Sequence, residues 1–131
     1  MIDEKLTKHL QEQITNNTEN IESIIEKDFY STTEQLIGKW INGKNLYRRV
    51  FTGNTGTSNY WRNAVANVPN NLEITKLTAI IGDYLPVPIY IDSSYYVALQ
   101  YNSSANAIQT YNKGYANSDI EIVVEYTKKD N

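Results

Sequence analysis

The side chains of this sequence best suited to bind a ligand are aromatic rings set among polar residues. They occur at residues 60–63, 92–96 and 111–115, in a chain that contains 11 tyrosines. A flat ring can stack on the face of a sugar while neighbouring polar groups bind the hydroxyls, and Tyr and Trp with polar neighbours equally suit protein interfaces. The candidate ligand contacts are Tyr60, Trp61, Arg62, Tyr95, Tyr96, Tyr111 and Tyr115.

A purely structural role for the rings is the alternative to ligand binding. About half of them would then lie in the core at strand ends. We expect this role above all for Tyr101 and Tyr126, because they alternate in step with aliphatic residues. The sequence alone leaves ligand site, subunit interface and core open for the others.

Catalytic chemistry has little support in the sequence. The only histidine is His9 and there is no cysteine, which excludes Ser-His-Asp and Cys-His nucleophile systems and thiolate zinc sites from the aromatic segments. No segment has the acidic spacing of a calcium loop. A glycoside hydrolase needs only two carboxylates, but Glu121 and Glu125 fit the polar face of a strand. We therefore expect no enzyme, no metal and no cofactor.

Length and charge limit the classes of protein further. The 131 residues allow one ordinary domain, or a small domain with an accessory segment. No apolar run approaches the roughly 18 residues of a membrane span, and the N-terminus lacks the apolar stretch of a signal peptide. A net charge of −3 argues against binding to phosphate backbones. We expect a soluble chain with no nucleic-acid partner and no membrane insertion.

The first 27 residues predict a helix with an oligomer seam, because they lack Gly, Pro and aromatic residues and have apolar residues at spacings typical of a coiled coil. Isoleucine at both kinds of seam position favours three or four strands. We expect residues 1–28 to form the coiled-coil stalk of a homotrimer; the alternative is an amphipathic helix packed on its own domain. The seam residues are Leu10, Ile14, Asn17, Ile21 and Ile24.

From residue 29 onward the hydrophobic period changes to two, which predicts β-strands. The clearest strand runs from Ile120 to Tyr126, and others are expected at 77–81, 96–101 and 107–111. Residues 86–91 contain two prolines and therefore belong at a sheet edge or a strand start. Six or seven such strands predict a mainly β fold, with residues 29–131 forming an antiparallel β-sandwich.

A hairpin is predicted around the Asn42-Gly43 turn, between strands at 37–41 and 46–52. Trp40 and Tyr47 flank this turn, and we expect their rings to pack as near-opposed aromatics.

This hairpin also carries a family resemblance. Tyr30-Ser31-Thr32-Thr33-Glu34, followed by Ile37-Gly38-Lys39-Trp40-Ile41-Asn42-Gly43-Lys44-Asn45-Leu46-Tyr47-Arg48-Arg49, resembles a segment of tail-fibre and minor structural (receptor-binding) proteins of phages of Gram-positive bacteria. Asn42 stands where that segment usually has Asp, and Asn45 where it usually has Pro. The resemblance covers about 20 residues and contains no catalytic group.

The resemblance implies a virion structural protein, assembled in the host cytoplasm and located in the phage tail. Together with the predicted stalk it suggests a homotrimeric receptor-binding tip that attaches noncatalytically to a bacterial surface glycan, with other phage tail proteins as partners. Two alternatives stay open. One is a trimerisation or baseplate adaptor module with protein partners only, and the other is an enzyme that degrades cell-wall glycan.

Overall fold

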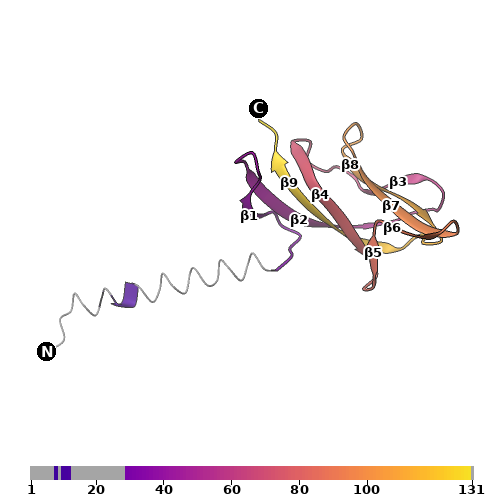
Figure 1. Cartoon of the computed structure of the whole chain (residues 1–131), viewed down its shortest axis with the longest axis horizontal. Helices are drawn as coiled ribbons and strands as arrows, with labels where there is room; N and C mark the ends of the chain where they lie inside the picture. Colours follow the sequence, from indigo (N-terminus) through magenta and orange to yellow (C-terminus); the bar gives the residue numbers. More distant parts are fainter. Residues whose placement is uncertain (1–7, 9, 13–28, 131) are drawn as a thin grey trace. The chain divides into compact units, whose positions relative to one another are not determined.

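The computed structural model describes residues 8, 10–12 and 29–130, and the chain divides into two compact units, Met1–Tyr30 and Ser31–Asn131 (Figure 1). In the first unit, Lys8 and residues 10–12 are helical, and Leu10 is half exposed. The other predicted seam residues, Ile14, Asn17, Ile21 and Ile24, lie outside the described residues. The coiled coil and its trimer therefore stay predictions.

The second unit is mainly β and contains two antiparallel sheets. The five-stranded sheet has the order β1-β2-β9-β4-β5, and the four-stranded sheet has the order β3-β8-β7-β6. The strands are β1 Gln35–Lys39, β2 Asn45–Asn54, β3 Trp61–Val65, β4 Leu72–Ile81, β5 Leu85–Val87, β6 Ile89–Asp92, β7 Tyr95–Asn102, β8 Ala107–Lys113 and β9 Asp119–Lys128.

The two sheets share one hydrophobic core, as expected of a β-sandwich. The centre of the five-stranded sheet is β9, whose Ile120, Ile122, Val124 and Tyr126 are all at most 2% exposed. The four-stranded sheet contributes Val97 and Ile108 to the same cluster. The alternation that predicts the β9 strand is therefore confirmed, and so is the inward position of Tyr126.

The segment with two prolines forms edge strands, as expected from its missing backbone donors. Pro86 lies in β5, at the edge of the five-stranded sheet, and β6 begins at Ile89, at the edge of the other sheet. The peptide bond between Val87 and Pro88, where the chain passes between the sheets, is cis.

The predicted hairpin forms, but its aromatic pair does not. Strand β1 ends at Lys39, so Trp40 lies in the turn, where its N–H donates to the carbonyl of Lys44 over 2.9 Å. Tyr47 is paired with Leu36, and its ring stacks on Tyr126 with centroids 5.8 Å apart. The expected contact is wrong because the turn is longer than the Asn-Gly pair alone indicates.

Candidate functional site

The outer face of the four-stranded sheet gathers rings and amides from all four strands. On β7, Val97 is buried, so its neighbours Tyr96 and Ala98 point to the opposite side, away from the core. The same alternation on β8 buries Thr110 and Asn112 and turns Tyr111 outward. Three of the predicted contacts, Trp61, Tyr96 and Tyr111, thus lie on one strand surface, and the positions of Tyr96 and Tyr111 agree with the strands expected at 96–101 and 107–111.

The aromatic residues on this face form a connected series, which we call the aromatic row. It consists of Trp61, Tyr111, Tyr96 and Tyr90, one from each strand of the sheet. Successive ring centroids are 5.7, 6.0 and 5.8 Å apart. Trp61 meets Tyr111 edge to face, and the remaining contacts are stacked. Since neighbouring strands lie about 4.8 Å apart, the row spans roughly 14 Å.

The rings at the two ends of the aromatic row are its most accessible ones. Trp61 is 43% exposed and Tyr90 is 70% exposed, whereas the inner rings are half-buried. Tyr90 is a ring that sequence reasoning missed. Its signal is its place in β6, opposite Tyr96, because cross-strand partners project to the same face of a sheet.

A second series on the same face consists of amides, and we call it the amide row. Gln100 Nε2 donates to Gln109 Oε1 over 2.8 Å, and Gln109 Nε2 donates to Asn63 Oδ1, also over 2.8 Å. Asn102 Nδ2 donates to Gln109 Oε1 over 3.3 Å. The chain of bonds has a direction: the Oε1 of Gln100 stays available as an acceptor at one end, and the Nδ2 of Asn63 as a donor at the other.

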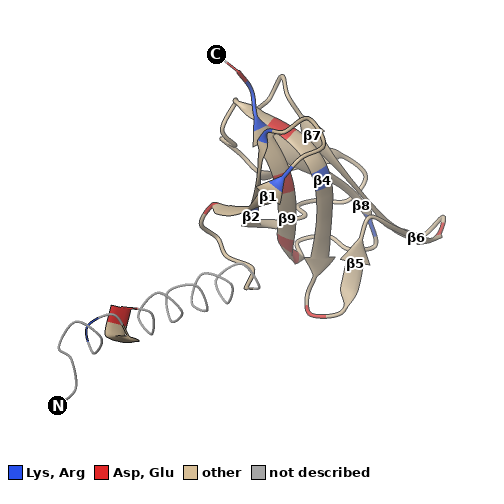
Figure 2. Ribbon diagram, turned by 60° about the vertical axis from the view of Figure 1, so that its left-hand side comes forward, with Lys and Arg blue, Asp and Glu red and all other residues tan. Residues whose placement is uncertain are grey.

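This face has little charge. Lys113, which pairs with Tyr96 in the β7–β8 register, is its one charged side chain among residues that the structure describes. Of the charged residues that lie in strands, most belong to the five-stranded sheet, as the red and blue segments of Figure 2 show on β9 and β4. An aromatic and amide surface with little charge suits an uncharged polar ligand.

A shallow hollow of about 320 Å³ lies over the β6–β7 pair, next to two rings of the aromatic row. In the register, Tyr90 faces Tyr96 and Ile89 faces Val97, and Pro88 directly precedes β6. The hollow exists because Ala98 occupies a position where its neighbours on the face carry large side chains. Its lining consists of Pro88, Ile89, Tyr90, Tyr96, Val97 and Ala98.

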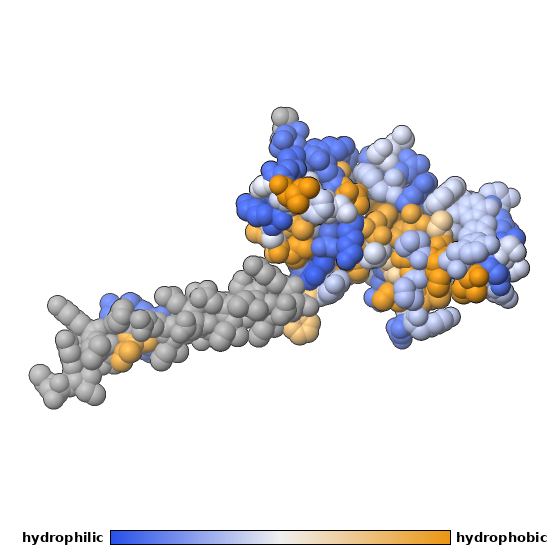
Figure 3. Space-filling view, viewed as in Figure 1, coloured by the Kyte–Doolittle hydropathy of each residue, from blue (hydrophilic) through white to orange (hydrophobic). Residues whose placement is uncertain are grey.

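The space-filling view shows the character of this region. At the end of the second unit where Figure 1 draws the β6–β7 hairpin, the surface is mainly pale blue, with hydrophobic residues in orange beside it (Figure 3).

The segment that precedes β3, residues 55–58, is held by hydrogen bonds to the buried side-chain amide of Asn112. Asn112, with 0% exposure, donates through Nδ2 to the carbonyls of Thr55, Gly56 and Thr57 over 3.3–3.4 Å. Its Oδ1 accepts from the hydroxyl of Ser58 over 2.8 Å. A polar side chain with all these bonds in the core holds the backbone before Trp61 in one conformation.

The hydroxyl group of Thr55 makes two further hydrogen bonds that hold this loop. It donates to the carbonyl of Tyr115 over 2.6 Å and accepts from the backbone N–H of Ser118. These two hydrogen bonds join the β2–β3 loop to the β8–β9 loop.

The remaining predicted contacts form two separate pairs. Arg62 projects to the side of β3 opposite Trp61, where its Nε donates to Thr57 Oγ1 and its guanidinium lies 4.9 Å from the ring centre of Tyr60. Tyr95 meets Tyr115 edge to face at 6.0 Å, and Tyr115 packs partly against the core. The structure therefore does not bring the seven predicted contacts into one site.

A second hollow, of about 540 Å³, has an acidic lining. It lies where β2, β9 and the β4–β5 turn meet, and none of its seven lining residues is aromatic. Asp119 accepts a hydrogen bond from Asn54 Nδ2 over 3.4 Å. Carboxylates without rings are less suited to hold a sugar than the aromatic row. The lining residues are Thr52, Gly53, Gly82, Asp83, Asp119, Ile120 and Glu121.

Glu34, Tyr126 and Lys128 form a structural cluster of titratable groups. Burial by itself raises the pKa of Glu34, but hydrogen bonds from Tyr126 (2.6 Å) and Lys128 (2.9 Å) outweigh it, so the pKa lies below its ordinary value. Burial, with the adjoining Glu34 carboxylate, raises the pKa of Tyr126. The tyrosine therefore stays a neutral donor to the carboxylate.

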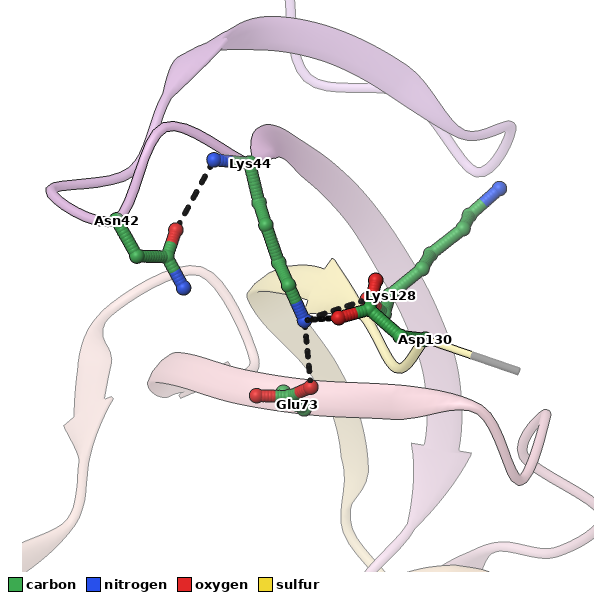
Figure 4. A network of polar contacts seen from close by, with 5 residues as sticks. All are labelled: Asn42, Lys44, Glu73, Lys128 and Asp130. Atoms are coloured by element: carbon green, nitrogen blue, oxygen red, sulfur yellow. Dashed lines mark hydrogen bonds and ion pairs between the residues drawn. The ribbon is translucent and has the colours of Figure 1, made fainter.

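A lysine joins three segments at the start of β2 (Figure 4). Lys44 Nζ lies 3.1 Å from Glu73 and 3.4 Å from Asp130, and it donates to the carbonyl of Lys128 over 3.3 Å. The hydrogen bond to Glu73 is the main cause that raises the pKa of Lys44. This cluster ties the β1–β2 turn to β4 and to the end of β9.

Residues 8, 10–12 and 29–130 contain no cluster of three or more His, Asp or Glu suited to hold a metal ion. They also contain no helix with the length and apolarity needed to span a membrane.

Comparisons with protein-family models, with curated proteins and with solved structures gave no match for this chain.

Proposed function

We propose that the chain is a noncatalytic glycan-binding module that attaches through the outer face of the four-stranded sheet. The observation that carries the proposal is the continuous aromatic row, from Trp61 to Tyr90, beside the amide row. Rings supply flat apolar contact at low entropic cost, and amides supply both donors and acceptors for hydroxyl groups. The low charge of the face favours an uncharged glycan over an ionic polymer.

The biological setting that we propose is the tail of a phage of a Gram-positive bacterium, where the module would be the receptor-binding tip of a homotrimeric fibre. The support is the sequence resemblance around the β1–β2 hairpin and the heptad spacing of residues 10–24. Three linked copies would convert weak single-site contacts into strong attachment, because the later contacts form at high effective concentration.

Cosedimentation with bacterial cells tests the proposal. Labelled full-length chain is mixed with heat-killed cells of several Gram-positive species, before and after periodate oxidation of their glycans. We expect binding to cells of at least one species, loss after oxidation, and survival after protease treatment of the cells. Binding that is lost after protease and kept after periodate would contradict the proposal and favour a protein partner, the adaptor alternative.

Variants locate the site on the molecule. Trp61→Ala and Tyr96→Ala should each weaken binding by about 30-fold, the effect of about 2 kcal/mol that removal of a central anchor has at interfaces. Tyr84→Ala is the matched control, since Tyr84 is a 76% exposed tyrosine of the β4–β5 turn. Asp119→Asn tests the acidic hollow, which the alternative of a glycan-degrading enzyme would use. A loss with Asp119→Asn alone would contradict the proposed site.

A further inference from the structure

We propose that the hollow at Ala98 receives the acetamido group of a sugar, so that the face selects glycans that contain N-acetylated amino sugars. This inference rests on the proposed function and names the ligand class of the same site.

Shape is the first argument. The cross-strand partners Tyr90 and Tyr96 line the hollow together with Pro88 and the small side chain of Ala98. On β8 the partner of Ala98 is Tyr111, so a ring also stands beyond the small residue. A sugar in contact with the stacked Tyr90–Tyr96 pair would place its substituent over a floor of apolar groups and backbone.

Polarity is the second argument. Along β7, outward positions recur roughly every 7 Å, so the order is a ring at Tyr96, a gap at Ala98 and an amide at Gln100. The Nε2 of Gln100 donates to Gln109, which leaves its Oε1 as the acceptor of this side chain that a ligand could use. An acetamido group carries a methyl group, a carbonyl and an N–H donor, of which the methyl group matches the apolar gap and the N–H matches the acceptor that follows it.

Charge is the third argument, because it excludes the main competitors for the hollow. The described part of the chain places no carboxylate on the lining and only Lys113 on the surrounding face. A cationic amino sugar would find no partner carboxylate here. Acetylation removes that positive charge and adds the methyl group that the hollow can bury.

The test uses two oligosaccharides that differ only in the substituent at position 2 of each sugar ring, an acetamido group in one and a hydroxyl group in the other. A β-1,4-linked oligomer of N-acetylglucosamine and a glucose oligomer of the same linkage and length are titrated by calorimetry into the full-length chain. We expect the acetylated oligomer to bind about tenfold more tightly, the combined effect of one buried methyl group and one hydrogen bond. Equal affinities, or a preference for glucose, would overturn the inference but leave the proposed function intact.

Substitutions at the hollow separate this preference from binding in general. Ala98→Leu fills the hollow and should bring the two affinities within about twofold of each other, while the glucose oligomer still binds. Ala105→Leu is the matched control, because Ala105 is exposed in the β7–β8 connection. It should keep the tenfold preference. A preference that survives Ala98→Leu would place the acetamido group elsewhere and overturn the inference.

A measurement on the wild-type protein tests the inference even if Ala98→Leu folds poorly. In NMR spectra of the full-length chain, the acetylated oligomer should shift the Ala98 methyl and Gln100 side-chain amide signals, and the glucose oligomer should shift them less. No binding of the acetylated oligomer would also overturn the inference. In that case, cosedimentation with cells shows independently whether the protein binds another glycan or whether the proposed function is wrong as well.

Discussion

At the scale of single residues, the buried amide of Asn112 is the clearest link between the core and the candidate face. It satisfies three backbone carbonyls and a serine hydroxyl within the segment that delivers Trp61. The aromatic contact at the surface therefore depends on a polar group in the interior, which hydrophobic patterning does not indicate.

Replacing Asn112 with Ala should lower the free energy of unfolding by about 2 kcal/mol, because it leaves buried carbonyl groups without donors. Urea unfolding followed by circular dichroism measures this change. Asn70→Ala is the control, since Asn70 is exposed just before β4 and its removal should change stability by less than about 0.5 kcal/mol. Equal stabilities of the two variants would show that the loop does not depend on Asn112.

The cluster of Glu34, Tyr126 and Lys128 should make stability depend on pH. The folded-state pKa of Glu34 is lowered, so the carboxylate stabilises the fold above its unfolded value of 4.5, and this contribution is lost as pH falls through the folded pKa. Glu34→Gln removes the titration. Urea unfolding should show wild type more stable than Glu34→Gln at pH 7, with the difference shrinking below pH 4.5. A difference that is constant across this range would contradict the assignment.

At the scale of elements, one glycine marks a close approach of the two sheets. A Cβ atom at Gly53 of β2 would overlap the carbonyl oxygen of Ala64 of β3. The backbone of β3 therefore packs directly on β2, and this contact fixes the strand that carries Trp61.

Gly53→Ala should lower the free energy of unfolding by about 2 kcal/mol or more, because the backbone must shift to admit a methyl group. Gly38→Ala is a matched control in β1, where a Cβ would meet nothing within 4 Å. It should be neutral or slightly stabilising, since alanine has less conformational entropy to lose than glycine. Thermal unfolding of the two variants distinguishes the cases; similar melting temperatures would refute the close-packing argument.

The strands that the sequence predicts best are those with strict alternation. Strand β9 is evident from Ile120 to Tyr126, and β7 from Val97 to Tyr101, because one face of each is buried in the core. Strand β3 has only five residues, with polar residues at Arg62 and Asn63, so its pattern does not separate it from a loop. The sequence pattern therefore predicts no strand at Trp61 and Arg62, whose side chains lie on opposite sides of β3.

The composition of the candidate site was more predictable than its geometry. Tyr96 and Tyr111 are 15 residues apart in sequence, and Tyr90 carries no local signal of binding. Their contact depends on the register of β6, β7 and β8, which follows from long-range pairing and turn geometry. Tyr115 was expected at the site but packs partly against the core, because β8 ends at Lys113 and the chain then turns inward.

At the scale of the whole molecule, the proposed fibre role requires a trimer. Light scattering on the full-length chain should give about three times the 15.0 kDa mass of one copy. Substituting Ile14 and Ile21 with Asn should reduce the mass to that of a monomer if the predicted seam holds the copies together. A full-length monomer would refute the stalk, and a trimer that survives both substitutions would place the interface in the β unit.

The division of charge between the two sheets gives the molecule two different surfaces. Ion pairs such as Lys76–Glu125 lie on the five-stranded sheet, whereas the opposite sheet presents rings and amides. This asymmetry is the whole-molecule reason to assign ligand binding to the four-stranded sheet.

A glycan array is the most direct test of that assignment. Full-length wild type, Trp61→Ala, Tyr96→Ala and Tyr84→Ala are applied to the same array of bacterial surface polysaccharides and defined oligosaccharides. We predict that wild type and Tyr84→Ala bind the same uncharged glycans, and that Trp61→Ala and Tyr96→Ala lose them. Failure of wild type to bind any glycan, or equal binding by all four proteins, would contradict the account.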